Sequence, residues 1–316
     1  MALALPSPAP AQQAPARRSP FSPTTDQTIY PLEKLAAGVY AVLGDTGRGA
    51  EGRPNAGFID TEEGVVVVGG VASPAQGRAL VRTIRTVTRR PILWLVLYAH
   101  HPDMQFGAIA LRDAGAKVIA HPDRQVLAAD AGPDAMVADW DRVVGLQEML
   151  GFQYADTPDR PVTGCDTLRL AGKAIVIFHP ADAHSAGDLL IWLPVERVLF
   201  AGDVLLSDGV TMVVDGSSVA LLRTLDAIDS LDARVIVPGH GAIPADPTSL
   251  VARTRSYMSD LRSAMLAAVK GGTSMQHAIA SLPPPDPDRP VSLASRKRRN
   301  AARVYLEVEK EVMGLD

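Results

Sequence analysis

Short hydrophobic runs alternate with amphipathic segments along most of the chain, beginning near residue 38. The segment "GFIDTEEGVVVVGG" (57–70) holds two β-rich runs around a polar turn, a pattern that predicts an antiparallel hairpin. The segment "ILWLVLYA" (92–99) is too continuously apolar for a half-exposed strand, so it predicts a strand buried on both faces. Further strands are expected at 117–121, 174–180, 188–194, 197–203 and 234–240. Strands alternating with helices, without a repeat, favour one α/β domain.

Helix signals lie between these strands. Ser73 and Pro74 supply an N-cap and a first-turn proline for a helix that ends before Pro91. A short helix is expected at 108–114, and a longer one carries Leu221, Leu225 and Ile228 on one face. Near the C-terminus, 255–269 and 297–312 predict two amphipathic helices around the proline-rich segment 283–290. The pattern therefore predicts a helical extension after the α/β core.

The first 27 residues are rich in Ala, Pro and Gln and show no periodicity, which is typical of a disordered tail. Residues 28–316 are expected to form the folded domain. Within the tail, an apolar stretch precedes an A-P-A type cleavage site, although the basic start of a secretory signal is missing. The tail is therefore either a plain extension of a cytoplasmic protein or a signal remnant of a periplasmic or secreted one.

The composition excludes several classes of function. The chain has 316 residues, 47% of them apolar, which is enough for a sizeable core. Its net charge of -4 argues against a nucleic-acid partner, and no apolar run approaches the roughly 18 residues of a membrane span. Cys165 is the only cysteine, so a disulfide within the chain and a multi-cysteine zinc site are excluded. Any metal must be bound by histidines and carboxylates.

Histidines and aspartates gather where the predicted strands end. His101 and Asp103 follow the strand at 92–99, and three more such residues lie in glycine-containing segments at strand boundaries: His184 in "ADAHSAGD", Asp203 in "LFAGDVL" and His240 in "VPGHGA". Each residue taken alone fits a structural role. Together, three imidazoles and two carboxylates indicate a site for zinc, iron or manganese.

The segments "AHSAGD", "LFAGD" and "VPGHG" resemble motifs of the metallo-β-lactamase superfamily, in the order that the family has them. The resemblance implies an αββα sandwich with one or two metal ions between its sheets. A closer resemblance is to the quinoprotein relay system zinc metallohydrolases, which are periplasmic proteins. It is carried by "NAGFI" (55–59), the P-D-x-x-F-G frame at 102–107 and "RNAARVYLEVE" (299–309), and it covers roughly residues 30–316.

The segment "AHHPDMQFG" (99–107) departs from the family pattern H-x-H-P-D-H-x-F-G. Ala99 replaces the first histidine and Met104 the last, so the motif is degenerate. Gly69 stands where the family usually has an aspartate that supports the ligand loop. His100 replaces the missing ligand only if the loop shifts by one residue. Met104 is either an apolar plug or a soft thioether ligand.

The resemblance implies a metal-dependent hydrolase in which a metal ion activates water for attack on an ester, lactone or thioester. One zinc ion is expected rather than two, held by His101, His184 and Asp203, with Asp103 or His240 as base or water orienter. Asp103 and His240 are also the remaining candidate metal ligands beside the shared Asp203. Iron in place of zinc is an alternative. A further alternative is a metal-free pseudoenzyme that acts as a binding or accessory subunit. The expected partner is accordingly a small-molecule substrate or another protein.

Overall fold

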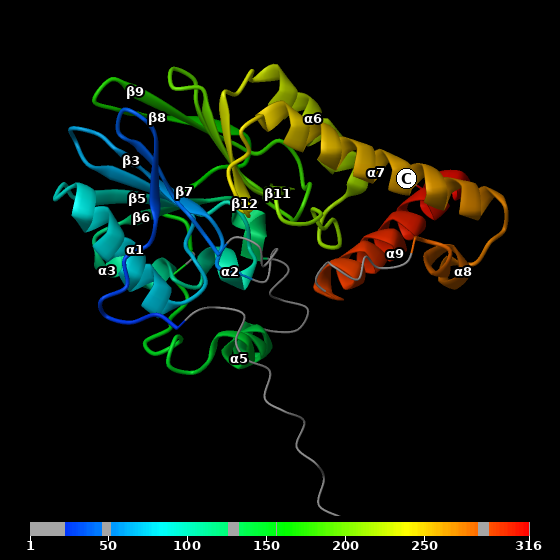
Figure 1. The fold of residues 1–316 in the computed structure, drawn as a ribbon, viewed down its shortest axis with the longest axis horizontal. Coiled ribbons are helices and arrows are strands. Elements are labelled where there is room, and N and C mark those ends of the chain that lie inside the picture. The colour runs from blue at the N-terminus through cyan, green and yellow to red at the C-terminus, as the bar shows by residue number, and fades with distance from the viewer. Residues whose placement is uncertain (1–22, 46–51, 126–132, 156, 284–290, 316) are drawn as a thin grey trace, which may run out of the picture.

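The computed structural model describes residues 23–45, 52–125, 133–155, 157–283 and 291–315. Two β-sheets lie face to face (Figure 1). The first has seven strands in the order β1 to β7: Leu32–Ala36, Val39–Val42, Ala56–Asp60, Val65–Val68, Ile92–Val96, Lys117–Ala120 and Arg160–Pro161. The second has five in the order β12, β11, β10, β9, β8, with bounds Val235–His240, Val198–Leu206, Leu190–Leu193, Lys173–Phe178 and Cys165–Leu170.

Alternate residues along the strands build separate layers of the core. In β4, Val66 and Val68 pack between the two sheets, whereas Val65 and Val67 pack on the outer face of the first sheet. The same alternation in β11 places Phe200 between the sheets and its neighbours on the outer face. Because successive side chains of a strand point to opposite faces, each sheet needs a cover on both sides. The expected αββα sandwich is confirmed.

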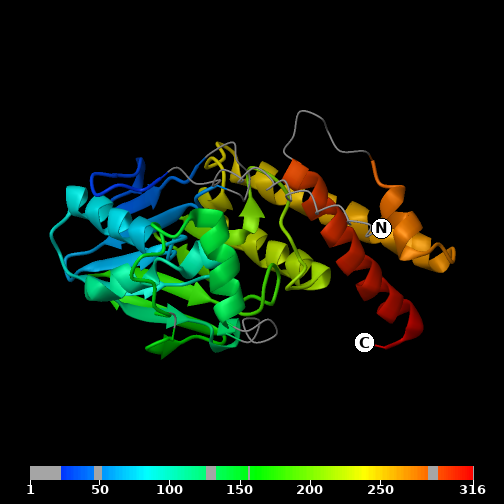
Figure 2. The same ribbon diagram turned by 90° about the horizontal axis from the view of Figure 1, so that it is seen from below.

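Helices cover the two outer faces. α1 (Pro74–Val87) and α3 (Ala108–Asp113) pack on the first sheet. The second sheet is covered by α6 (Ser218–Ser230) and α7 (Pro247–Lys270). α9 (Val291–Met313) packs against α7, and α8 (Met275–Ala280) lies between these two helices in the chain. α7, α8 and α9 extend beyond the sandwich as a helical lobe (Figures 1 and 2). The predicted C-terminal helical extension is therefore present.

The local signals before the first helix behave as predicted. β3 and β4 pair antiparallel and form the expected hairpin. The Ser73 side chain accepts a hydrogen bond from the Gln76 amide at 3.1 Å, which caps α1. β4, β5 and β6 then run parallel, so their carboxyl ends meet at one edge of the first sheet. The short helix α2 (Pro102–Gln105) begins at that edge.

β11 is longer than the predicted segment 197–203. It continues to Leu206, so Asp203 lies within the strand and not at its end. The reason is the parallel pairing with β12, which resumes after an irregularity around Gly202 and reaches Leu206 opposite His240. His240 is likewise the last residue of β12 and not part of a loop. Both candidate ligand residues are therefore held in strands that pair with each other.

The excursion at 122–163 contains a 3₁₀ turn, η2 (Pro122–Gln125), and the helix α5 (Pro133–Val144). The Trp140 indole donates a hydrogen bond to the Ala72 carbonyl at 2.7 Å. Trp140 also lies edge-on to the Phe106 ring, with 6.4 Å between ring centroids. The excursion therefore packs beside α2 and the start of α1.

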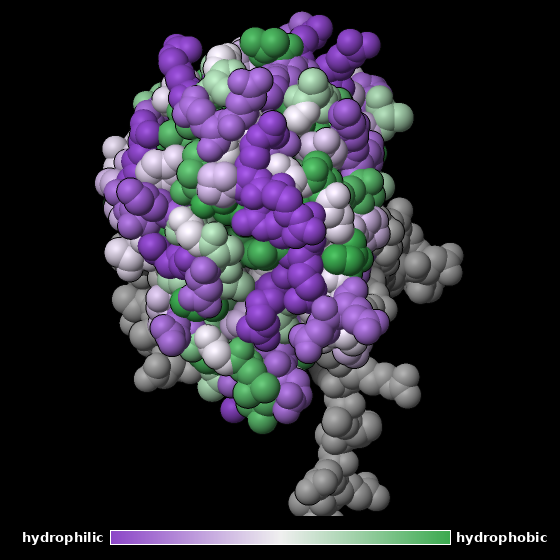
Figure 3. Space-filling model, turned by 90° about the vertical axis from the view of Figure 1, so that its left-hand side faces the viewer, coloured by the Kyte–Doolittle hydropathy of each residue, from purple (hydrophilic) through white to green (hydrophobic). Residues whose placement is uncertain are grey.

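The surface of the sandwich end seen in Figure 3 mixes polar and apolar side chains among the described residues, without one broad hydrophobic area. None of the helices in the described part of the chain combines the length and apolarity that crossing a membrane requires.

Candidate metal centre

The five predicted donors lie together where the edges of the two sheets meet. The elements that carry them are far apart in the chain: His101 is the N-cap of α2, Asp103 lies in α2, His184 lies in the loop between β9 and β10, Asp203 lies in β11 and His240 ends β12. Their donor atoms form two overlapping groups of three, each within 4.8 Å.

The first group consists of His101, His184 and Asp203. Nε2 of His184 lies 2.9 Å from Nδ1 of His101 and 3.6 Å from Oδ2 of Asp203. Two ring nitrogens and one carboxylate oxygen thus face a common point. This set matches the three protein ligands of catalytic zinc sites and leaves a further coordination position for water or substrate.

The second group consists of Asp103, Asp203 and His240. Nε2 of His240 lies 3.0 Å from Oδ2 of Asp103 and 3.7 Å from Oδ1 of Asp203. Asp203 thus offers one oxygen to each group. The second group has one nitrogen and two carboxylates, a harder donor set than the first.

The centre has features of a cation site. Oδ1 of Asp203 is buried and has no hydrogen-bond partner within the described part of the chain. A Cβ atom on Gly239 would lie 2.0 Å from that oxygen, so the site requires glycine there. Nδ1 of His184 lies 2.8 Å from the Met212 carbonyl, which only accepts, so the proton is on Nδ1 and the Nε2 lone pair faces the centre. These donors fit zinc.

Burial and the neighbouring charges set the protonation of the centre. Burial and the nearby His101 lower the pKa of His184 to about 4, so its ring is neutral at pH 7. Burial acts to raise the pKa of Asp103, but the hydrogen bond and charge of His240 outweigh it and lower that pKa. Burial raises the pKa of Asp203, and the like charge of Asp103 adds to the effect. A positive charge is therefore favoured between these carboxylates.

The turn that carries His184 is organised by Asp188. Its Oδ2 accepts a hydrogen bond from the His184 amide at 2.6 Å, and its Oδ1 accepts one from the Ser185 hydroxyl at 2.6 Å. Asp188 is itself only 1% exposed. It holds the backbone of His184 and does not point into either group of donors.

The two positions at which the sequence predicts a departure from the family pattern are buried. Ala99 is 1% exposed and Met104 is 0% exposed, and both belong to the core between the sheets. This packing supports the interpretation of Met104 as an apolar plug. The ring of His100 lies edge-on to that of His101, with 4.4 Å between centroids. His100 forms a third group of potential donors with His101 and Asp215.

Two residues near the centre were not found from the sequence. Oδ2 of Asp215 lies 3.1 Å from Nε2 of His101, across 114 positions of the chain. Arg296 in α9 acts electrostatically on the centre, where its charge lowers the pKa of Asp103. The signal for Asp215 was the apolar run before it and the glycine after it in "MVVDGSS", a pattern shared with the recognised strand-end motifs. Arg296 lies in a basic helix start that has no such signal.

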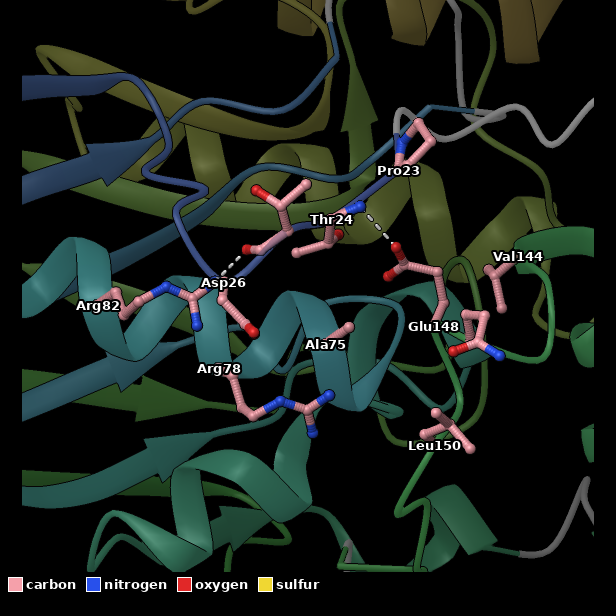
Figure 4. Close-up of a pocket in the computed structure, with 11 residues that line it drawn as sticks. Pro23, Thr24, Asp26, Ala75, Arg78, Arg82, Val144, Glu148 and Leu150 are labelled. Carbon is pink, nitrogen blue, oxygen red and sulfur yellow. Dashed lines mark hydrogen bonds between the residues drawn. The ribbon is translucent and has the colours of Figure 1, made fainter.

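Figure 4 shows a separate pocket of the structure. It is formed by Pro23–Asp26, α1 and residues 144–150, and none of the five donors lines it. Glu148 accepts hydrogen bonds from the Thr24 amide at 2.6 Å and the Ser73 hydroxyl at 2.8 Å. Arg82 of α1 donates a hydrogen bond to the Thr25 carbonyl at 2.7 Å, so the last residues of the expected tail contact α1. Residues 1–22 lie outside the described part of the chain. The residues around this pocket thus hold the N-terminal segment Pro23–Asp26 against the rest of the fold.

The sequence profile of the Metallo-beta-lactamase superfamily matches residues 49–240, a range that includes all five donors. The chain belongs to the metallo-beta-lactamase superfamily. Members of this superfamily are generally metal-dependent hydrolases and usually bind zinc. The candidate centre of this metallo-beta-lactamase family protein therefore has the donor types that the family uses.

Individual relatives agree with this assignment. A Metallo-beta-lactamase type 2 from Bacteroides fragilis is 28% identical over 107 residues, which are 32% of this chain and 42% of that protein. A Beta-lactamase-like protein 2 homolog from Caenorhabditis elegans is 38% identical over 92 residues, which are 29% of this chain and 28% of that protein. The matches thus span less than half the length of these relatives.

The fold is similar to that of a metallo-beta-lactamase family protein from Thermus thermophilus, with a TM-score of 0.64 and 19% identity. That comparison covers 89% of this chain and 95% of the other. At this identity the likeness concerns the fold alone.

Proposed function

We propose that the protein is a hydrolase that uses one metal ion, held by His101, His184 and Asp203. The observation that carries the proposal is the convergence of two ring nitrogens and one carboxylate oxygen in the first group, with 2.9 Å between the nitrogens. When bound, a divalent metal supplies a Lewis acid that activates water for attack on an electrophile.

Zinc is the proposed metal. Zinc prefers nitrogen ligands together with carboxylates, and the first group offers two imidazoles, whereas the second offers one. In the second group, two of the three donors already bind each other, because Nε2 of His240 contacts Oδ2 of Asp103 at 3.0 Å. One ion is therefore proposed rather than two. Iron is the alternative metal for a set of two histidines and one carboxylate.

Asp103 has the proposed role of general base. Its lowered pKa keeps the carboxylate ionised at neutral pH, and His240 orients it through the contact to Oδ2. Asp103 also lies within 4.8 Å of Asp203, which belongs to both groups. It is therefore placed to accept a proton from water that attacks at the centre.

The proposed substrates are esters, lactones or thioesters, in which water adds to the carbonyl carbon and the alcohol or thiol leaves. We also propose the quinoprotein relay branch of the superfamily, with a degenerate ligand motif at Ala99 and Met104. Periplasmic or secreted localisation belongs to the same proposal, as does one functional domain over residues 28–316. Cell fractionation with N-terminal sequencing of the purified protein tests the localisation.

The metal-free binding subunit is not favoured, because both groups keep three donors within 4.8 Å. In this proposal Ala99 and Met104 each replace one family ligand, one in each group. The first group still has three donors and leaves a coordination position free for water or substrate.

Elemental analysis of protein purified without chelator, followed by turnover on a panel of esters, lactones and thioesters, tests the proposal. We expect about one metal ion per chain. We expect metal and turnover to be lost in His184→Ala and kept in the control His277→Ala, since His277 lies exposed in α8. A wild-type protein without metal, or turnover that His184→Ala leaves intact, would contradict it.

A further inference from the structure

Asp215 contacts the ring atom of His101 that faces away from the first donor group. Nδ1 of His101 faces His184, and Nε2 faces Oδ2 of Asp215 at 3.1 Å. A carboxylate at Nε2 holds the proton on that nitrogen and leaves the Nδ1 lone pair directed to the centre.

The segment that carries Asp215 lies between the donors and helix α9. Met212 accepts the hydrogen bond from His184, and the Val213 amide donates to the Asn300 side chain at 3.0 Å. The Asn300 amide group also donates to the Thr211 carbonyl at 2.8 Å. Asn300 is 0% exposed. One side of this short segment thus faces the centre, and the other is held by the C-terminal helix.

A second contact from the same helix lies directly after Asp215. The Arg303 guanidinium donates to the Gly216 carbonyl at 2.7 Å. Asn300 and Arg303 are three positions apart and so lie on one face of α9, where both reach the segment. The backbone on each side of Asp215 is therefore fixed from the C-terminal extension.

We propose that Asp215 is a positioning residue of the metal centre, and that α9 sets its place through Asn300 and Arg303. The inference rests on the proposed function, since it assigns Asp215 the task of orienting a ligand of the same metal ion. The C-terminal helical lobe then supports the metal centre through α9.

A separate metal site formed by His100, His101 and Asp215 fits the geometry less well. The two nitrogens of His101 lie on different sides of its ring, so one ring would have to bind two metal ions and lose both its protons. A neutral imidazole that donates from Nε2 to a carboxylate and binds metal through Nδ1 needs no such loss.

The experiment compares Asp215→Asn and Asp215→Ala with the control Asp113→Asn, an exposed aspartate in α3. Zinc affinity is measured by chelator competition, and the ligand field is followed by the visible spectrum of the cobalt-substituted protein. We expect zinc affinity to fall about 10- to 100-fold in Asp215→Ala, and less in Asp215→Asn, whose amide oxygen still accepts the hydrogen bond. A shifted cobalt spectrum separates misplacement of His101 from a loss of stability alone.

The tautomer of His101 is tested in the metal-free protein by ¹⁵N NMR of labelled histidine at alkaline pH. We expect the Nε2–H form in the wild type and a mixture in Asp215→Ala. If the wild type binds no metal, the proposed function fails, while the tautomer still decides the role of Asp215. Unchanged zinc affinity or an unchanged tautomer in folded Asp215→Ala would overturn the inference.

The role of α9 is tested with Arg303→Ala, because the buried Asn300 is less tolerant of change. Its control is Arg299→Ala, an exposed position on the same helix. Zinc affinity should fall several-fold in Arg303→Ala and stay unchanged in the control. In an Asp215→Ala background the effect of Arg303→Ala should largely disappear, since it acts through Asp215. Equal effects in both backgrounds would contradict the link.

Discussion

The hydroxyl of Tyr98 lies beside Gly69, so close that a Cβ atom at position 69 would stand 3.0 Å from it. The same hydroxyl donates to the Asn55 carbonyl at 2.8 Å, and the ring lies against Gly202. Tyr98 thus fills the space next to Gly69 and leaves little room for a larger side chain at that position.

Gly69→Asp alone should destabilise the protein. Gly69 has a φ of +87°, and its new side chain would meet the Tyr98 hydroxyl. We expect a loss of about 2 kcal/mol in the free energy of unfolding, from backbone strain and overpacking. Denaturant unfolding measures it, and the loss should be smaller when Tyr98→Phe is already present. An additive double mutant would show that the two positions do not interact.

The double substitution Ala99→His/Met104→His should create a second metal site that the wild type lacks. Both positions are buried between the sheets, so two imidazoles there should destabilise the metal-free protein by about 2 kcal/mol or more. Zinc should then raise Tm more than in the wild type, and elemental analysis should find an additional ion. The matched control Ala99→Asn/Met104→Gln should lose stability without gaining zinc. No added zinc in the histidine variant would contradict the prediction.

Arg296→Gln should strengthen metal binding. The Arg296 charge lowers the pKa of Asp103, Asp203 and His240, so it contributes a positive potential at the centre. Removing it should raise zinc affinity about three-fold at low ionic strength, and less at high salt, where the charge is screened. Chelator competition at two salt concentrations measures this. Arg299→Gln, exposed on the same helix, is the control, and weaker binding in Arg296→Gln would sink the idea.

The stability of the metal-free protein should depend on pH through His184. Its folded pKa of about 4 lies below the ordinary value of 6.5, so the unfolded state binds the proton first. His184 therefore costs stability as the pH falls from about 6.5 to about 4, with a slope approaching 1.4 kcal/mol per pH unit. Urea unfolding of chelator-treated protein should show a shallower slope in His184→Gln. Parallel curves for the two proteins would argue against a neutral buried ring.

Short segments of the sequence predict much of the fold and most of the candidate metal centre. The continuously apolar runs of β4 and β5 predict strands that are buried on both faces, because burial depends on the side chain at each position. β4 is buried throughout, whereas Leu93 and Trp94 of β5 are half-buried. The five donors lie in short glycine-containing or strand-end motifs, so His184 and His240 were recognisable without coordinates. The end of β11 was not, because it depends on pairing with β12.

The tertiary structure alone decided which groups complete the centre. Asp215 follows a strand-like run in the sequence, but its contact with His101 exists only in the folded chain. Asn300 likewise acquires its role only when α9 packs against the segment 211–216 that carries Asp215. The space beside Gly69 is likewise defined by Tyr98, which is 29 positions away in the chain. A short motif can show which residues are able to bind a metal, because that ability is a property of each side chain. Orientation and second-layer support depend on distances between remote segments, and only folding sets those.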